Sequence, residues 1–341
     1  MMRAHARTHL FLLASAFLAA VPLAQPLAAS AATAVSQSDS SAEIARLYDA
    51  GLYEQAMKVL HAAIEASPMD ASLHGSLGRC YYQLRDYNHA SSSLERAVAL
   101  DPNNSDYHEW LGKAYGRRAE QSNPFSALSL ARKAHKEFTE AVRLNPSNLA
   151  AQRDLIRYLL DSPGIAGGGQ DRADEQIEAL TKVDAVEGQL ARAEADITRK
   201  KFDLADEAYQ KLLESHPRRI GVDMEIAEYY RDRGDGQHME QAVDAAAALD
   251  PSDVRLSYYR GVALVIAKKD PVKAEQLLRT YLDTVPNNSE LPPRSSAREW
   301  LGRLYEQEDK RDNAAEQYQA GLALDPGNKT LRDGLRRVQK K

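Results

Sequence analysis

Proline recurs at intervals near 34 residues, and this period constrains the fold more than any other feature of the sequence. The prolines that keep it are Pro68, Pro102, Pro146, Pro217, Pro251, Pro286 and Pro326, with gaps of 34, 44, 71, 34, 35 and 40 residues. Each follows a helical pattern, and a helix cannot continue through proline without losing a hydrogen bond and clashing with the previous turn. The gap of 71 closes if a degenerate unit ends at Asp184-Ala185. The period predicts an all-α array of helical repeats.

The clearest unit spans residues 71–104, and its apolar positions have helical spacing in both halves. Gly78 and Ala90 stand where two helices must approach closely, and larger residues surround them. These larger positions are Leu77, Tyr81, Tyr87, Leu94 and Leu100. The run of small and aromatic positions resembles the tetratricopeptide repeat (TPR), a helix-turn-helix unit of about 34 residues.

The resemblance covers nearly the whole mature chain and implies a right-handed α-solenoid of about eight units with a C-terminal capping helix. The predicted units are 37–70, 71–104, 105–148, 149–185, 186–219, 220–253, 254–288 and 295–328, and the predicted cap is 329–341. Some units depart from the pattern, since Arg192-Ala193 replaces the usual Leu-Gly pair in the fifth unit and Met239 replaces alanine in the sixth. The cap is basic at its end, as suits a solvated last helix.

The first 34 residues have the pattern of a secretory signal peptide. Arg3 and Arg7 precede an apolar run from Leu10 to about Leu23, and small residues suitable for cleavage end at Ala31 and Ala34. The run is shorter than the roughly 20 residues that a spanning helix needs. We therefore expect cleavage after Ala31 or Ala34, a mature chain over 35–341 without stable membrane insertion, and a bacterial periplasmic or secreted location.

The charge balance and the cysteine count exclude some classes of function and of fold stabilisation. Without the leader the chain keeps 42 basic and 49 acidic side chains, a net charge of about minus seven, which argues against general nucleic-acid binding. The single cysteine, Cys80, excludes an internal disulfide. We interpret it as a small buried side chain, with a redox role as the alternative.

Two units carry added residues, which in repeat arrays usually form loops that are free to acquire a role. The third unit gains ten residues near Gly116–Asn123, after which Pro124 and Ser126 start an unusually long second helix. The fourth unit contains the glycine-rich segment 163–169. Three successive glycines predict a tight, irregular turn. A phosphate-cradling loop is the alternative, but neither a Gly-Lys-Ser or Gly-Lys-Thr ending nor a preceding strand pattern accompanies it.

The sequence contains none of the common catalytic motifs, and we predict a protein that is not an enzyme and needs no metal or cofactor. His74 and His108 occupy the same place in adjacent units. A metal site built on them would need further ligands, and Glu109 is the only obvious nearby carboxylate. We interpret both histidines as packing residues between helices.

The TPR resemblance further implies that the first helix of each unit lines a concave groove. In units two to four the lining is basic and is our predicted partner-binding site: Arg79, Tyr82, Gln83, Lys113, Arg117, Arg153 and Arg157. In units five and six it is largely acidic: Glu187, Glu194, Glu228, Arg231 and Asp232. In unit seven it is Tyr258, Val262, Val265 and Ile266.

The basic stretch predicts a partner that is acidic or offers a free C-terminal carboxylate, held by charge-assisted hydrogen bonds. Some TPR proteins clamp such a carboxylate with lysine and asparagine, but Arg79 stands where the asparagine would be. A second interpretation, in which these arginines only solvate a helix face, stays open.

We therefore predict a non-catalytic scaffold that binds a protein or peptide in its groove. A self-associating structural or envelope-assembly component is the alternative, and a hydrolase with a site in the insertions is a third hypothesis. The sequence does not name the partner or the oligomeric state.

Overall fold

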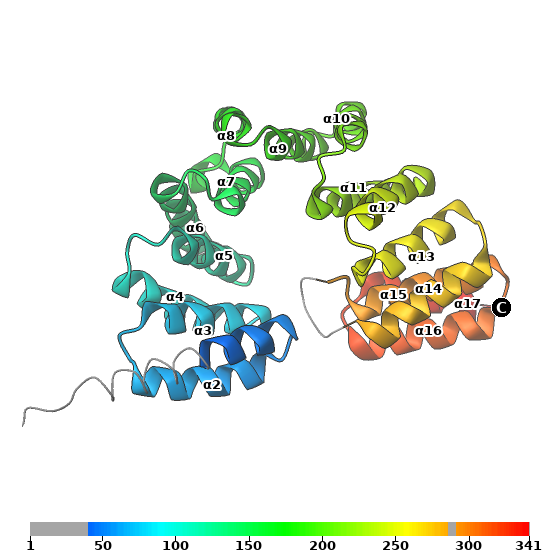
Figure 1. The fold of residues 1–341 in the computed structure, drawn as a ribbon, viewed down its shortest axis with the longest axis horizontal. Coiled ribbons are helices and arrows are strands. Elements are labelled where there is room, and N and C mark those ends of the chain that lie inside the picture. Colours follow the sequence, from blue (N-terminus) through cyan, green and yellow to red (C-terminus); the bar gives the residue numbers. More distant parts are fainter. Residues whose placement is uncertain (1–39, 286–290, 341) are drawn as a thin grey trace, which may run out of the picture.

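The computed structural model describes residues 40–285 and 291–340, and every regular element in these ranges is a helix (Figure 1). The all-α solenoid predicted from the proline period is confirmed. The predicted signal peptide, the last residues of unit seven with Pro286, and Lys341 lie outside the described residues. No helix in the described ranges has the length and apolar character needed to cross a membrane.

Consecutive helices pack as pairs, one pair in each predicted unit. In the N-terminal half the pairs are 40–49 with α2 (Tyr53–Ala66), α3 (Ala71–Gln83) with α4 (Tyr87–Leu100), α5 (Ser105–Glu120) with α6 (Pro124–Leu144), and α7 (Leu149–Asp161) with α8 (Gln170–Val183). In the C-terminal half they are α9 (Ala185–Thr198) with α10 (Phe202–Ser215), α11 (Ile220–Arg233) with α12 (Gly236–Leu249), α13 (Arg255–Ala267) with α14 (Pro271–Thr284), and α15 (Arg294–Gln307) with α16 (Arg311–Leu324). Helix α17 (Lys329–Gln339) packs on the last pair.

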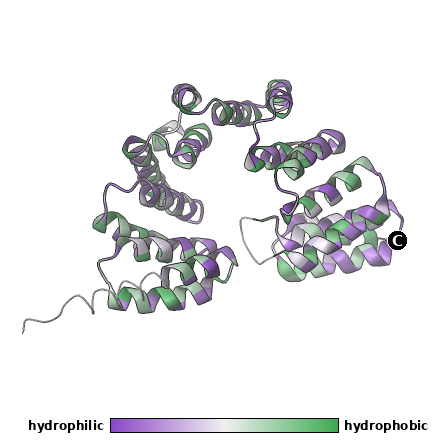
Figure 2. Ribbon diagram, viewed as in Figure 1, coloured by the Kyte–Doolittle hydropathy of each residue, from purple (hydrophilic) through white to green (hydrophobic). Residues whose placement is uncertain are grey.

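The pairs stack into an arch. Helices α5, α7 and α9 lie on its inner side, while α6, α8 and α10 lie outside them (Figure 1). Buried apolar side chains form clusters that follow one another along the chain, and apolar residues are spread over all of the helices (Figure 2). Each repeat thus buries its apolar faces against its neighbours, as expected for a solenoid.

Close helix crossing explains the small residues of the repeat. A Cβ atom added to Gly78 would lie only 2.5 Å from the Cγ atom of Leu94 and 3.1 Å from the carbonyl oxygen of Ala90. Ala90 and Leu94 are fully buried. The absence of a side chain at Gly78 therefore lets the backbone of α3 lie directly against α4.

The turns between units are held by a repeated side-chain bond. Nε2 of His74 lies 3.0 Å from the carbonyl oxygen of Pro68, and Nε2 of His108 lies 3.0 Å from that of Pro102. Gln152, at the same place in the fourth unit, donates to the carbonyl oxygen of Pro146. A side chain six residues after each of these prolines thus satisfies its carbonyl group, which gives the two histidines a structural role.

In the third unit the long second helix predicted from Pro124 is confirmed, whereas the expectation of a loop near residues 116–123 is wrong. Residues 116–120 continue α5 to 16 residues, and α6 extends to 21, so that only residues 121–123 separate them. Asn123 begins α6 by accepting hydrogen bonds from the backbone N–H groups of Phe125 and Ser126, with Pro124 at the first helical position, a favoured arrangement for a helix start. The added residues therefore lengthen both helices.

The insertion in the fourth unit forms a tight, irregular turn around a short 3₁₀ helix, η1 (Gly164–Ala166). Gly167 has a φ angle of +104°, which favours glycine. A Cβ atom on Gly168 would lie 1.7 Å from the carbonyl oxygen of Ser162. Backbone packing therefore accounts for these two glycines.

Candidate binding groove

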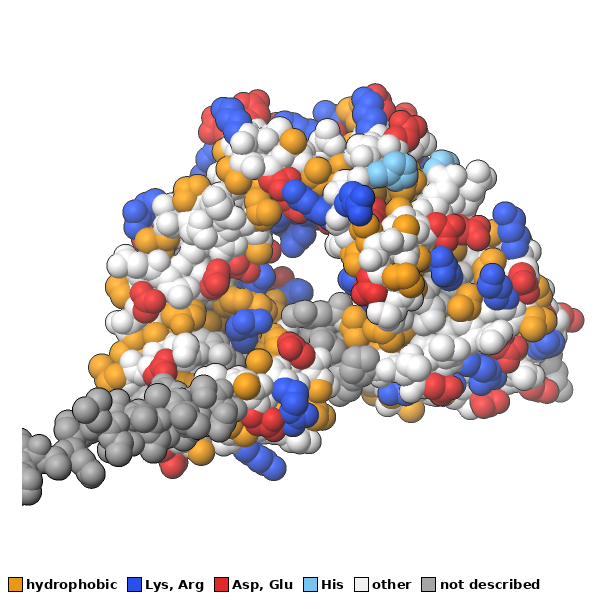
Figure 3. All heavy atoms as spheres, in the orientation of Figure 1, with side chains coloured by type: hydrophobic (Ala, Val, Ile, Leu, Met, Phe, Trp, Pro, Cys, Tyr) orange, Lys and Arg blue, Asp and Glu red, His pale blue; other side chains and the backbone are white. Residues whose placement is uncertain are grey.

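Two adjoining hollows on the inner side of the arch form a continuous groove, which we call the concave groove. The first, of about 470 Å³, is lined mainly by α5, α6 and α7. The second, of about 530 Å³, lies between α7, α9, α10 and α11. Arg157 and Asp161 line both hollows and join them. The space-filling view shows the inner space that the arch surrounds (Figure 3).

Arg153 is the centre of an ion-pair cluster that links units four, five and six. Its guanidinium lies 3.1 Å from Glu187, 2.8 Å from Glu194 and 2.8 Å from Glu225. The Arg153 side chain is only 13% exposed. Burial by itself would lower the pKa of Arg153. The hydrogen bond and the charge of Glu225, together with the other carboxylates, have a larger effect and raise the pKa above its usual value. Arg153 is therefore a charged structural tie between α7, α9 and α11.

Burial raises the pKa of Glu225 above its usual value, although the hydrogen bond and charge of Arg153 pull it down. The basic zone and the acidic zone that the sequence suggested as separate parts of the groove thus neutralise one another across repeat boundaries. The spacing of residues along the chain does not reveal this pairing, because the partners are 34 and 72 positions apart.

Lys113 and Arg79 are also engaged within the protein. The Lys113 amine lies 2.6 Å from Glu109 and 3.1 Å from Asp154, and 4.6 Å from the centre of the Trp110 ring. The guanidinium of Arg79 lies 4.9 Å from the same ring, on an adjacent repeat. These contacts make the two cations part of the packing between units two, three and four.

Tyr82 and Gln83 complete this packing. Tyr82 contacts Trp110 edge to face, with ring centres 5.3 Å apart. The side-chain amide of Gln83 donates to the Tyr48 hydroxyl at 2.7 Å. Tyr82 still lines the first hollow, whereas Gln83 does not.

Three of the predicted cations line the groove. Lys113 lines the first hollow at 25% exposure, whereas Arg117 and Arg157 are more open, with side chains 51% and 54% exposed. Arg117 pairs with Glu120 at 2.9 Å, and Arg157 pairs with Glu194 at 3.0 Å. Such exposed pairs contribute little to stability, so these guanidinium groups can exchange their partners. The structure places them at the first hollow and at the junction of the two hollows.

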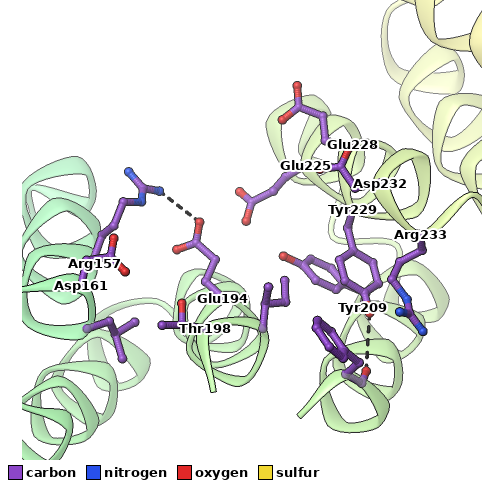
Figure 4. Close-up of a pocket in the computed structure, with 13 residues that line it drawn as sticks. Arg157, Asp161, Glu194, Thr198, Tyr209, Glu225, Glu228, Tyr229, Asp232 and Arg233 are labelled. Atoms are coloured by element: carbon purple, nitrogen blue, oxygen red, sulfur yellow. Dashed lines mark hydrogen bonds and ion pairs between the residues drawn. The ribbon is translucent and has the colours of Figure 1, made fainter. Parts of the chain in front are cut away.

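The second hollow has an aromatic wall and an acidic rim (Figure 4). Tyr209 and Tyr229 stack with ring centres 4.3 Å apart, and the Tyr229 hydroxyl donates to Asp206 at 2.6 Å. Figure 4 shows Glu194 of α9 and Glu225 of α11 pointing toward one another, and Arg153 pairs with both carboxylates. Asp161 lies at the junction with the first hollow, and burial raises the pKa of its carboxyl group.

Sequence reasoning missed part of this lining. Phe202 and Tyr209 come from α10, a second helix of its unit, whereas the TPR resemblance directs attention to first helices. Phe202 is the first residue of α10 and is 40% exposed. The signal available in the sequence was an aromatic residue at the start of the helical pattern.

The groove lining expected from unit seven is wrong. Tyr258, Val262 and Val265 are buried, at 1%, 0% and 1% exposure. They belong to the same core cluster as Trp300 of α15, and Gln307 of α15 donates to the Val265 carbonyl oxygen at 3.1 Å. Unit eight thus packs over this face, while Ile266 stays partly exposed.

Of the residues expected from unit six, Glu228 and Asp232 line the second hollow, whereas Arg231 does not. Glu228 accepts a hydrogen bond from the Tyr259 hydroxyl, and Arg231 pairs with Asp232 at 2.9 Å. Among the described residues no three His, Cys, Asp or Glu side chains converge as metal ligands would. Charged and aromatic groups along an open groove can hold an extended chain segment.

Comparisons with known proteins identify the family. Models of the tetratricopeptide repeat match residues 47–114, 224–289 and 295–328. The chain is a TPR protein. TPR arrays serve as protein–protein interaction scaffolds and are typically non-catalytic, which is the class that the helix pairs and the groove define. A comparison with curated protein sequences finds no match.

Solved structures show the same fold at low identity. The chain is 14% identical to yeast Tom70, with a TM-score of 0.59, over 85% of this chain and 58% of that one. It is 17% identical to IFIT1 in a structure with Gppp-AAAA, with a TM-score of 0.50, over 87% and 72%. A thermophilic TPR protein of Thermus thermophilus is 21% identical, with a TM-score of 0.47, over 56% and 97%.

Proposed function

We propose that the protein binds an extended segment of a partner protein in the concave groove, and that it does so in a bacterial periplasm or outside the cell. One observation carries the binding site: the two hollows share Arg157 and Asp161 and so form one path from α3 to α11. A path of this length accommodates a chain segment better than a small molecule. The leader pattern in residues 1–34 supports the location.

The partner segment carries an acidic side chain or a free C-terminal carboxylate. Arg157 and Arg117 offer exposed guanidinium groups, and a carboxylate can replace Glu194 or Glu120 as their hydrogen-bonding partner. Arg153 does not bind the partner carboxylate, because its guanidinium already pairs with three carboxylates of the protein. Phe202, the exposed member of the aromatic wall, would pack against an apolar side chain of the same segment.

The binding test selects peptides with free C-termini from a displayed random library on the immobilised protein and measures their affinities by fluorescence anisotropy. We expect acidic or C-terminal carboxylate peptides, with affinity falling about tenfold or more when Arg117 and Arg157 are both changed to Glu. Arg143→Glu is the matched control, since Arg143 is an exposed α6 residue outside the groove lining that also pairs with a glutamate three positions away. Selected peptides that bind both variants equally would contradict the proposal.

The location is tested separately. A fusion of residues 1–40 to a β-lactamase without its own leader should protect bacteria from ampicillin, because the enzyme acts only after export. A fusion that is produced but gives no protection would refute the export of the protein.

A further inference from the structure

The two insertions that interrupt the repeat period contact each other in the structure. The Arg132 guanidinium of α6 donates to the carbonyl oxygen of Ile165 in η1 at 3.1 Å. The Tyr158 hydroxyl lies 2.7 Å from the carbonyl oxygens of both Ala131 and Ala166 and bridges the same two elements. The lengthened α6 and the glycine-rich turn therefore present one joint surface. We call Phe125, Leu128, Arg132, Lys133, Lys136 and Ile165 the insertion surface.

Two large apolar side chains stand out from this surface into solvent. Phe125 is 91% exposed at the start of α6, and Ile165 is 67% exposed in η1. Phe125 lies two helical turns before Arg132, on the same face of α6, and Arg132 holds the backbone of Ile165. Exposed apolar residues that gather on one surface mark an interaction site more often than single ones do.

Cations surround these apolar side chains. Arg132, Lys133 and Lys136 are exposed, and Arg172 lies next to the turn, where it donates to the Gly168 carbonyl oxygen. Among the described residues these four cations form no ion pair with a carboxylate, although Arg143 further along α6 does. The cluster is therefore a local positive field on a protein whose net charge is negative.

A neighbouring titratable group responds to this field. His135 of α6 stacks on Tyr158 at 5.4 Å. Burial lowers its pKa, and the positive charge of Arg172 lowers it further. Arg172 thus brings positive charge close to His135 on α6.

We propose that the insertion surface docks the protein peripherally on an anionic membrane. Phe125 and Ile165 enter the boundary between headgroups and acyl chains, while Arg132, Lys133 and Lys136 contact lipid phosphates. Each cation near such a surface strengthens binding about fivefold at moderate salt, and one or two apolar anchors add to it.

The shape of the surface favours a membrane over a partner helix. A shallow hollow of about 390 Å³ runs along it, but α6 alone lines this hollow, from Phe125 to Lys136. A groove for a helix needs two walls, and this one has a single wall. The apolar side chains sit at chain turns and project outward, which suits contact with a broad, deformable surface.

The surface is independent of the concave groove. Helix α6 lies on the outer side of α5 in the arch (Figure 1). Its Ala131 and Phe138 line the first hollow, but none of the six residues of the insertion surface lines either hollow. Docking through α6 would leave the groove open to a partner. The two proposals can therefore fail separately.

The test is co-sedimentation of the full mature protein with vesicles of phosphatidylcholine, with and without phosphatidylglycerol, at low and high salt. We expect binding only to the anionic vesicles, weakened by salt. Changing Arg132, Lys133 and Lys136 together to Gln should weaken binding about tenfold or more. Phe125→Ser with Ile165→Ser should also weaken it, whereas peptide binding in the groove should not change.

A matched control comes from α14, where an exposed apolar residue also lies beside lysines. Val272 is 77% exposed, and Lys269 and Lys273 are exposed. Val272→Ser with Lys269→Gln and Lys273→Gln should leave vesicle binding unchanged. Equal loss in both sets would overturn the proposal, as would no binding to anionic vesicles. A concentration-dependent increase in mass that Phe125→Ser abolishes would overturn it too, since the surface would then join copies of the chain.

Discussion

Arg153→Met tests whether the ion-pair cluster around Arg153 ties three repeats together. The variant keeps an unbranched apolar stem but removes the guanidinium that Glu187, Glu194 and Glu225 share. Removing one partner of a buried ion pair costs about 3–5 kcal/mol. The three carboxylates are 17–27% exposed and recover part of their hydration, so we expect a loss of about 2–3 kcal/mol near neutral pH. Urea unfolding followed by circular dichroism measures it.

The loss should depend on pH, and its sign follows from proton binding. Without Arg153 the clustered carboxylates repel one another, and their pKa values in the folded state rise above those in the unfolded state. In the native protein, burial already raises the pKa of Glu225. The folded variant then binds protons that the unfolded chain does not, so its stability increases as the pH falls. We expect the difference from the native protein at about pH 5 to be less than half of that at about pH 7.5.

Two controls define what would refute this reasoning. Arg143→Met removes an exposed pair with Glu140 and should cost no more than about 0.5 kcal/mol. Combining Arg153→Met with Glu225→Gln should cost less than the sum of the two changes by about 1 kcal/mol or more, because the residues are in contact. A loss for Arg153→Met that matches the Arg143→Met loss, or one that does not change with pH, would show that the cluster does not join the repeats.

Three further predictions concern the buried interior. Gly78→Ala should lower the free energy of unfolding by about 1–3 kcal/mol in urea, since its Cβ would meet Leu94 at 2.5 Å; unchanged stability would show that the crossing can relax. Asp223 is 2% exposed and burial raises its pKa to about 6, so its ionisation makes the fold less stable as the pH rises from about 4 to 6. Asp223→Asn should therefore stabilise the protein by about 1–2 kcal/mol at neutral pH and much less at about pH 4, and equal effects at both would contradict this. Cys80 is fully buried and burial raises its pKa to about 11, so a thiol reagent should modify the native protein far more slowly than the urea-unfolded chain.

The helical architecture was predictable because its signals are local. Prolines end helices wherever they occur, and Gly78 facing Ala90 requires a close crossing whatever the rest of the chain does. The period then repeats the same local solution, so a single clear unit predicts the others. The burial of Cys80 was predictable for the same reason, because it is a small apolar residue within a helical pattern.

The candidate site was predictable only in part. The phase of the repeat, which follows from the helical period, puts Arg117 and Arg157 on the face that lines the hollows. It does not show that Arg153 is neutralised by Glu225 two units further on, or that Tyr258 is covered by unit eight. Those outcomes depend on how far each repeat rotates on its neighbour, and no residue pattern within a unit specifies that rotation.

The sequence by itself determined the helical repeat, the family and part of the groove lining. Only the tertiary structure decided which of these residues remain available, by pairing the cations of units three and four with acids of units three to six. It also brought the two insertions together, so that Phe125 and Ile165 share one basic surface. The physical reason is that hydrogen bonds and helix propensity act within a few residues, whereas charge pairing and burial act between any groups that the stacking of the repeats brings together.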